Sequence, residues 1–179
     1  MATDATQGVI DRVVERLSAG DIAHVVVATT SGATGVRFAE ALADEPVRVV
    51  CVTHHVGFAG GDVDEVDPAH RDRLEELGAA IVTATHALSG VPRSFSKALG
   101  GTSTAEIVAH TLRLFGQGVK VCVEIAVMAA DAGSIPTDRD AICVGGTGSG
   151  ADTAIVVRPA HMNAFLDTRI REILSFPTA

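Results

Sequence analysis

Short runs of apolar residues recur along the chain and predict buried β-strands. The runs fall at His24–Thr29, Val47–Thr53, Ala80–Thr85, Ala141–Val144 and Ala154–Val157. They show little alternation between apolar and polar positions, which is typical of strands that are buried on both faces in a parallel sheet. The pattern therefore predicts a mostly parallel sheet that helices cover on both sides.

Segments with apolar residues three or four positions apart lie between these runs and predict helices. They are Gly8–Ala19, Gly32–Ala43, Ala69–Leu77, a helix that begins at the capping box Ser103–Glu106 and ends at Leu114, and the nearly all-apolar Val119–Ala132. In Leu166–Leu174 the same spacing favours a helix over a last strand. We expect a loose tail at residues 1–6, a long loop at His54–Pro68 and a mixed segment at His86–Gly101.

The alternation of strands and helices predicts one α/β domain, a three-layer sandwich over residues 1–179. The composition agrees, because 47% of the residues are hydrophobic whereas aromatic residues make up only 3%. The net charge is −8, and the sequence has no run of basic residues. Nucleic acid and anionic membranes are therefore not expected as partners.

The three cysteines, Cys51, Cys122 and Cys143, each lie inside an apolar run. No CxxC pair is present, so the sequence predicts reduced core cysteines rather than a disulfide framework or a zinc site. No apolar segment typical of a signal peptide follows Met1, and no apolar run reaches the ~18 residues of a membrane span. We expect a cytoplasmic protein.

Hydroxyl and glycine residues gather where the first predicted strand ends and a helix begins, in Thr29-Thr30-Ser31-Gly32-Ala33-Thr34. The N–H groups in the first turn of a helix lack intrahelical acceptors, and the helix dipole favours an anion there. Open α/β sheets also bind ligands beyond the carboxyl ends of their strands. The segment therefore predicts an anion site. The alternative is a plain helix cap, in which Ser31 or Thr30 only stabilises the first turn.

A second glycine-rich loop, Gly145–Gly150, lies between two predicted strands and precedes Asp152 and Thr153. Such a loop can turn several backbone N–H groups toward one bound group, such as a phosphate, a carboxylate or the edge of a flavin ring. The alternative is a structural glycine hairpin. The ligand-binding candidates of this region are Gly146, Thr147, Gly148, Gly150, Asp152 and Thr153.

Lys120, Glu124 and Asp131 interrupt the most apolar predicted helix. Their spacings of four and seven place them on one face. Either this polar stripe faces a ligand pocket, or Lys120 and Glu124 form a structural pair.

Three histidines directly follow predicted strands and are candidates to line a pocket: His54 and His55 after one strand, and His86 after another. A metal site is not expected, because no HxxxH or HExxH motif is present and successive strand residues point to opposite faces. No GxSxG or other nucleophile arrangement is present either.

Several stretches together resemble the stand-alone proteins that are similar to the C-terminal domain of pyruvate kinase. They are VVVATTSGATGVRFAEAL, VVCVTHHVGF, LSGVPRS, TLRLFGQGVKVCVEIAVMAADAGSIP and ICVGGTGSGADTAIVVRP. The resemblance covers about residues 8 to 177 and implies the α/β sandwich of that domain. Pyruvate kinases often have Arg where this chain has Ala33, so a sugar bisphosphate effector is put in doubt. Pyruvate kinase activity is not expected, because no barrel domain is present.

The resemblance implies that flavin mononucleotide (FMN) is the ligand. Thr29, Thr30, Ser31, Gly32 and Thr34 would then hold its phosphate, and Gly146–Gly150, Asp152 and Thr153 would lie near the rest of it. The leading hypothesis is an FMN-binding protein with a possible redox role as a flavin-dependent oxidoreductase of unknown substrate. The alternatives are a regulatory module for another phosphorylated metabolite, and an interaction subunit with Val119–Ala132 as the oligomer contact. A homo-oligomer is expected.

Overall fold

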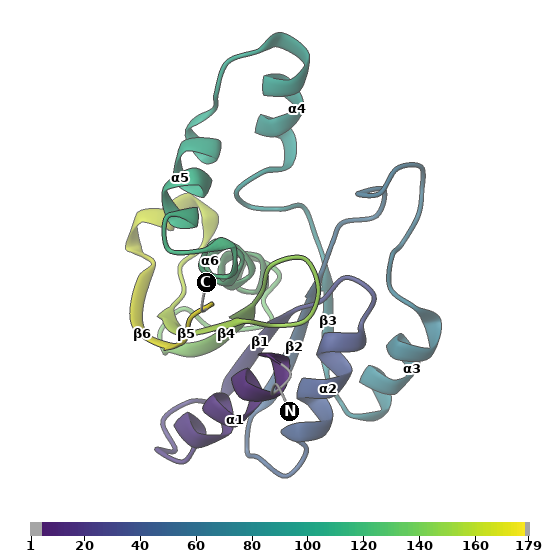
Figure 1. Cartoon of the computed structure of the whole chain (residues 1–179), viewed down its shortest axis with the longest axis vertical. Coiled ribbons are helices and arrows are strands. Elements are labelled where there is room, and N and C mark those ends of the chain that lie inside the picture. Colours follow the sequence, from purple (N-terminus) through teal and green to yellow (C-terminus); the bar gives the residue numbers. More distant parts are fainter. Residues whose placement is uncertain (1–4, 178–179) are drawn as a thin grey trace.

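A six-stranded sheet forms the centre of the molecule. The computed structural model describes residues 5–177 (Figure 1). The strands lie in the order β3-β2-β1-β4-β5-β6. The first four are parallel to one another, β5 is antiparallel to β4, and β6 is antiparallel to β5. The bounds are His24–Ala28 for β1, Arg48–Thr53 for β2, Ala80–Thr83 for β3, Ala141–Gly145 for β4, Thr153–Arg158 for β5 and Arg169–Ser175 for β6.

Helices pack on both faces of this sheet (Figure 1). On one face lie α1 (Ala5–Leu17), α2 (Ala33–Ala41) and α3 (Pro68–Glu76), and on the other lies α6 (Gln117–Asp131), against which α5 (Thr104–Arg113) packs. The remaining elements are α4 (Gly90–Leu99) and the short 3-10 helix η1 (Met162–Asp167). Alternate strand residues enter the two cores, because Val25 and Val27 pack with α1 and α2 whereas Val26 packs with α6. The predicted α/β fold with a mostly parallel sheet is confirmed.

Helix α6 lies in the core, with 12 of its 15 residues buried. Near its start, Gly118 lies against the β4–β5 hairpin. A Cβ atom at this position would lie 2.5 Å from Thr153 Cβ and 2.7 Å from Asp152 Oδ1. Gly145 approaches α6 from the other side, and a Cβ there would lie 2.8 Å from the carbonyl oxygen of Gly118. Since α6 is an internal element, the hypothesis that it forms an oligomer contact is wrong.

The last element is a strand, so the helix predicted over Leu166–Leu174 is wrong. β6 pairs with β5, but its register shifts between Ala154 and Ile155 and again between Val156 and Val157. These shifts break the two-residue period of a regular strand. Ile170 and Ile173 therefore pair with β5 residues although they are three positions apart, a spacing that imitates a helix.

Two other segments are more ordered than the sequence predicts. The mixed segment contains α4, in which Pro92 lies in the first turn, where a missing N–H costs nothing. The predicted loose tail is wrong for residues 5 and 6, because α1 begins at Ala5 and Thr6 is buried. The Thr6 hydroxyl accepts a hydrogen bond of 3.0 Å from the N–H of Ala151. Residues 1–4 lie outside the described residues.

The three cysteines are buried and free, as predicted. Burial raises the pKa of the Cys51 thiol to about 12, so this group is not a thiolate at neutral pH.

Among residues 5–177, no helix combines the length and the apolar character that crossing a membrane would require.

Candidate functional site

A cavity of about 630 Å³ lies at the carboxyl ends of the parallel strands β1 and β2. The loop after β1, the segments after β2 and β3, one face of α6 and the β4–β5 loop all contribute to its lining, and α4 and α5 add residues at its edge. The volume falls within the ~300–1,000 Å³ that is typical of small-molecule sites. The cavity therefore has room for a whole cofactor rather than a single ion.

The loop between β1 and α2, residues 29–34, contributes Thr29, Thr30, Ser31, Ala33 and Thr34 to the lining of this cavity, whereas Gly32 is buried behind the lining. Gly32 precedes α2 with a φ of +93°, and no side chain caps the helix from this position. Ser31 Oγ accepts only a long bond of 3.5 Å from the N–H of Ala33. Within residues 5–177 no atom accepts a hydrogen bond from the backbone N–H of Thr30, Ser31, Gly32 or Thr34. Thr29 Oγ1 also accepts a long bond of 3.4 Å from the N–H of Gly35, so hydroxyls of the loop cap part of the first turn. The four N–H groups that remain suit an anion.

Neighbouring elements hold this loop in place before any ligand binds. The N–H of Thr29 donates to the carbonyl of Val52 at 3.0 Å. The carbonyl of Ser31 accepts from the N–H of Asp67 at 3.0 Å and from His70 Nδ1 at 2.9 Å. A Cβ at Gly32 would lie 2.6 Å from that of His70, so a side chain there would push the two segments apart. The donors are thus preorganised, which lowers the entropic cost of binding.

Lys120 and Glu124 form a buried ion pair that faces the cavity from α6. Each residue is only 5% exposed. Lys120 Nζ donates to Glu124 Oε2, and Glu124 Oε1 accepts from the N–H of Leu88 at 2.8 Å. Both sequence-based alternatives are therefore realised at once, because the two residues pair and also line a pocket. Within the described chain Glu124 is the only partner of Lys120, so two of the three ammonium N–H donors have no protein acceptor.

Asp131 does not share this environment. Its carboxylate accepts from His161 Nδ1 at 3.0 Å and from the N–H of Met162 at 3.2 Å, so it fixes the start of η1 rather than lining the cavity.

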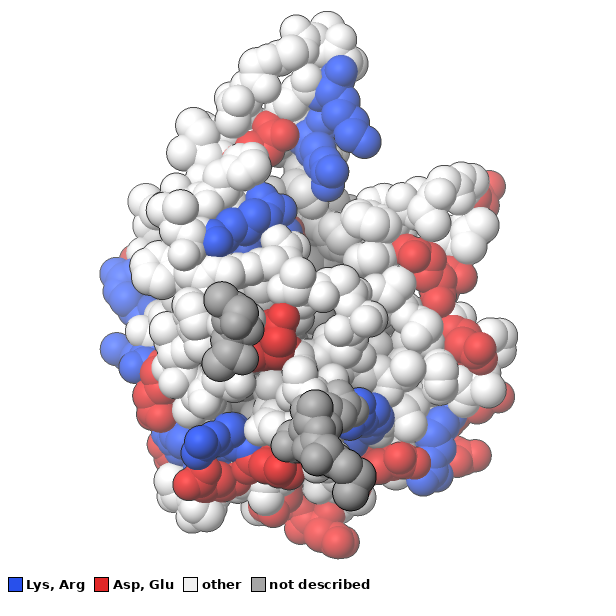
Figure 2. All heavy atoms as spheres, viewed as in Figure 1, with Lys and Arg blue, Asp and Glu red and all other residues white. Residues whose placement is uncertain are grey.

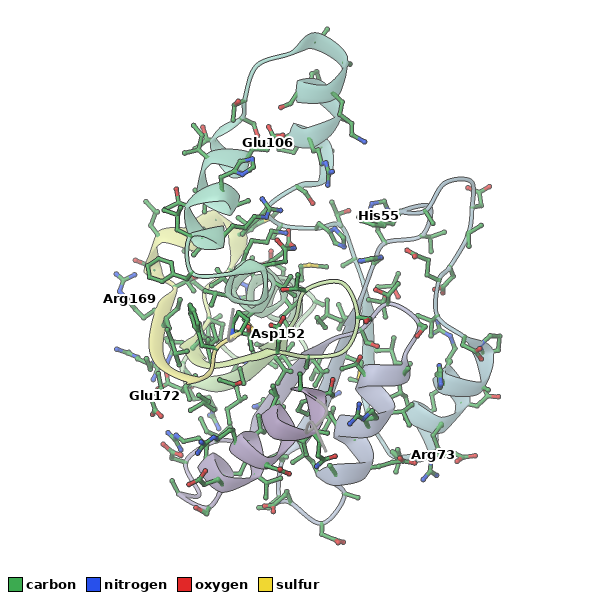
Figure 3. All side chains as sticks on the ribbon, in the orientation of Figure 1. His55, Arg73, Glu106, Asp152, Arg169 and Glu172 are labelled. Carbon is green, nitrogen blue, oxygen red and sulfur yellow. The ribbon has the colours of Figure 1, made fainter. Side chains whose placement is uncertain are left out.

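Histidine and phenylalanine rings form the cavity wall that follows β2 and β3. His54 stacks on Phe58 with ring centroids 3.9 Å apart, and His86 lies 5.1 Å from Phe58. His54, Phe58 and His86 line the cavity, whereas His55 contacts these rings from outside the lining. Figure 3 shows His55 on the segment that follows β2. Burial lowers the pKa of His86 to about 4, an effect that Glu124 opposes and His54 reinforces, so His86 is a neutral ring at pH 7.

The glycine loop reaches the cavity with only part of its predicted residues. Gly146, Gly148, Ser149 and Gly150 line it, whereas Thr147, Asp152 and Thr153 do not. The Asp152 carboxylate instead accepts from the N–H of Thr147 at 3.0 Å and from the Thr153 hydroxyl at 2.6 Å. Figure 3 shows Asp152 at the base of the loop. These three residues shape the hairpin, so the loop forms a structural hairpin and also contributes four residues to the lining of the cavity.

Two arginines at the edge of the cavity were not identified from the sequence. Arg93 comes from α4 and Arg113 from α5. Arg113 Nε donates to Gln117 Oε1 at 2.7 Å. The side chain of Glu106 joins the two helices, because it accepts from Ser96 Oγ on α4 and from the N–H of Ser103 at 2.9 Å (Figure 3). Hydrogen bonds from Ser96 and Ser103 lower the pKa of Glu106 to about 2, so this connection persists at acidic pH.

Within the described residues, no group of three or more His, Cys, Asp or Glu side chains is placed to hold a metal ion. No protein-family model matches the sequence.

Proposed function

We propose that this chain is an FMN-binding protein and that the loop of residues 29–34 holds the phosphate of FMN. The observation that carries the proposal is the set of backbone N–H groups at Thr30, Ser31, Gly32 and Thr34 that have no acceptor within residues 5–177. These donors stand at the start of α2, where the helix dipole adds a positive potential. A phosphate has enough oxygens to accept from several of them at once.

The rest of the cavity suits the flavin ring. Phe58 and His54 offer stacked aromatic faces, and Ile125 and Met128 contribute apolar surface from α6. Planar rings gain stability when they stack on such side chains. Gly146, Gly148 and Gly150 leave room for close approach of the ligand to the backbone. When bound, FMN would supply hydride or single-electron chemistry, for which the protein provides binding and electrostatics.

A regulatory module for another phosphorylated metabolite is the second candidate. Arg93, Arg113 and Lys120 also line the cavity, and they would suit a ligand with more negative charge than one phosphate. The family resemblance, which is carried by the sequence motifs alone, favours FMN over this alternative.

The absorption spectrum of the freshly purified protein tests the proposal. We expect flavin bands in the visible region and release of FMN on denaturation, or uptake of added FMN by colourless protein. A colourless protein that takes up no FMN but is stabilised by other phosphorylated compounds would favour the metabolite module instead.

Association of identical copies is also proposed. On α4 the side chains of Val91, Phe95 and Leu99 are 61% to 79% exposed and four positions apart, so they form an apolar stripe without a partner in the described chain. The molecular mass in solution tests this association: a multiple of the mass of one chain is expected, and the mass of a single chain would contradict it.

A further inference from the structure

The two arginines that line the cavity differ from most other arginines of this chain in their partners. Seven of the twelve lie 2.6–3.8 Å from a carboxylate oxygen of the described chain: Arg12, Arg16, Arg71, Arg73, Arg139, Arg158 and Arg171. The two that line the cavity do not. Within residues 5–177 the Arg93 guanidinium has no hydrogen-bond or ion-pair partner, and Arg113 uses only its Nε, on an uncharged amide. The terminal nitrogens of both side chains are therefore available to a ligand.

The charge balance of the cavity is opposite to that of the whole chain. The net charge of the chain is −8, yet among residues 5–177 Glu124 is the only carboxylate that lines the cavity, and Lys120 neutralises it. Arg93 and Arg113 then leave an excess of two positive charges, and the start of α6 at Gln117 adds the positive end of a helix dipole. Figure 2 shows Lys and Arg side chains on the α4–α5 side of the hollow and Asp and Glu side chains over the segment across from it.

The two positive regions of the cavity come from different elements. The loop of residues 29–34 belongs to the sheet side, between β1 and α2, whereas Arg93 and Arg113 come from the two helices that stand above α6 (Figure 1). FMN carries one phosphate, which the proposed function assigns to the loop. The arginines are therefore left for a second anionic group, and planar guanidinium groups bind carboxylates and phosphates through paired hydrogen bonds.

We infer that Arg93 and Arg113 form a second anion subsite, which binds the carboxylate or phosphate of a small substrate beside the flavin. The inference rests on the proposed function for the flavin, whereas the subsite itself rests on the terminal guanidinium nitrogens of Arg93 and Arg113, which have no partner within residues 5–177. Lys120 lines the same cavity, and two of its N–H donors have no acceptor within residues 5–177, so they can also donate to an anion there.

Thermal unfolding of flavin-free protein with malonate or with inorganic phosphate tests the subsite and distinguishes the two kinds of anion. We expect at least one of them to raise the unfolding temperature with saturation. Arg93→Gln and Arg113→Gln should each weaken that binding about tenfold or more. Arg12→Gln is the matched control, because Arg12 is exposed on α1 and its only ion-pair partner within residues 5–177 is Glu15. Its anion affinity should equal that of the wild type.

The outcomes separate this inference from the FMN proposal. Saturable malonate binding that depends on both arginines supports a carboxylate substrate, and phosphate binding with the same dependence supports a phosphorylated one. Protection by neither anion, or protection that both Gln variants retain in full, would overturn the subsite. If the protein binds malonate through the arginines but takes up no FMN, the anion subsite is supported and the FMN proposal is contradicted.

Discussion

Replacement of Gly118 with alanine is expected to destabilise the protein by about 3 kcal/mol or more, a large part of the ~5–15 kcal/mol of a typical domain. The new Cβ would lie 2.5 Å from Thr153 Cβ and 2.7 Å from Asp152 Oδ1, well inside contact distance. Thr153 is fully buried in β5, so neither it nor the start of α6 can move without disturbing the core. Urea denaturation of the two proteins measures the difference.

Gly8→Ala is the matched control for this substitution. Gly8 lies in α1, and a Cβ there would have no atom within 4 Å. Because alanine favours the helix, this variant should be more stable than the wild type by about 0.5–1 kcal/mol. If Gly118→Ala were as stable as the wild type, this result would contradict the close packing of α6 against the β4–β5 hairpin that the structure shows.

Glu124→Gln is expected to destabilise the protein by about 3 kcal/mol, although glutamate and glutamine have nearly the same shape. The amide oxygen can still accept from the N–H of Leu88, but Lys120 would remain buried without a counter-charge. The value lies at the low end for a broken buried pair, because both side chains line the cavity rather than lying in a closed core. Lys120→Met should cost a similar amount, since it leaves the carboxylate unpaired. Chemical denaturation of both variants tests this.

A double variant measures the coupling energy between Lys120 and Glu124 apart from the contribution of each side chain. Lys120→Met combined with Glu124→Gln removes both charges and keeps an acceptor for Leu88, so its stability should lie within about 1 kcal/mol of the wild type. Glu15→Gln is the exposed control, because it breaks a surface pair with Arg12 that is worth well under ~1 kcal/mol. Additive losses in the double variant would show that the two side chains are not coupled.

The sequence predicts the buried part of the fold well and the exposed part poorly. β1 and β4 are recognisable because both of their faces are covered, so nearly every residue is apolar. The last strand lies at the edge of the sheet with shifted register, so its apolar residues lose the two-residue period. Helix α4 has no buried residue, and its glycine, proline and serines suggest a loop. The four-residue spacing of the apolar residues Val91, Phe95 and Leu99 is the one signal in the sequence that would have predicted this helix.

Some residues of the candidate site can also be predicted from the sequence, whereas others cannot. Residues that directly follow parallel strands, such as Thr30, Ser31 and His54, must lie at the carboxyl edge of the sheet, so their position can be predicted. The placement of Arg93 and Arg113 depends on the path of the long connection from β3 to α6, which no local pattern reveals. Likewise, the sequence of the glycine loop does not distinguish residues that face the cavity, such as Gly148, from Asp152, which holds the loop from within.

The FMN affinity of Ala33→Glu tests the central claim most directly. Ala33 is the first residue of α2, is exposed and lines the cavity. A carboxylate there should leave the fold intact or stabilise it by about 0.3–1 kcal/mol through the helix dipole. The same carboxylate would repel a phosphate in the loop, by about 2 kcal/mol or more at short range.

We therefore expect Ala33→Glu to bind FMN at least ~30-fold more weakly than the wild type, as measured by quenching of flavin fluorescence in a titration. Ala33→Gln, which has the same size without the charge, should bind within about threefold of the wild type, a difference of under ~1 kcal/mol. Equal FMN affinity in the Glu and Gln variants would contradict the account, because the phosphate would then not lie at the start of α2.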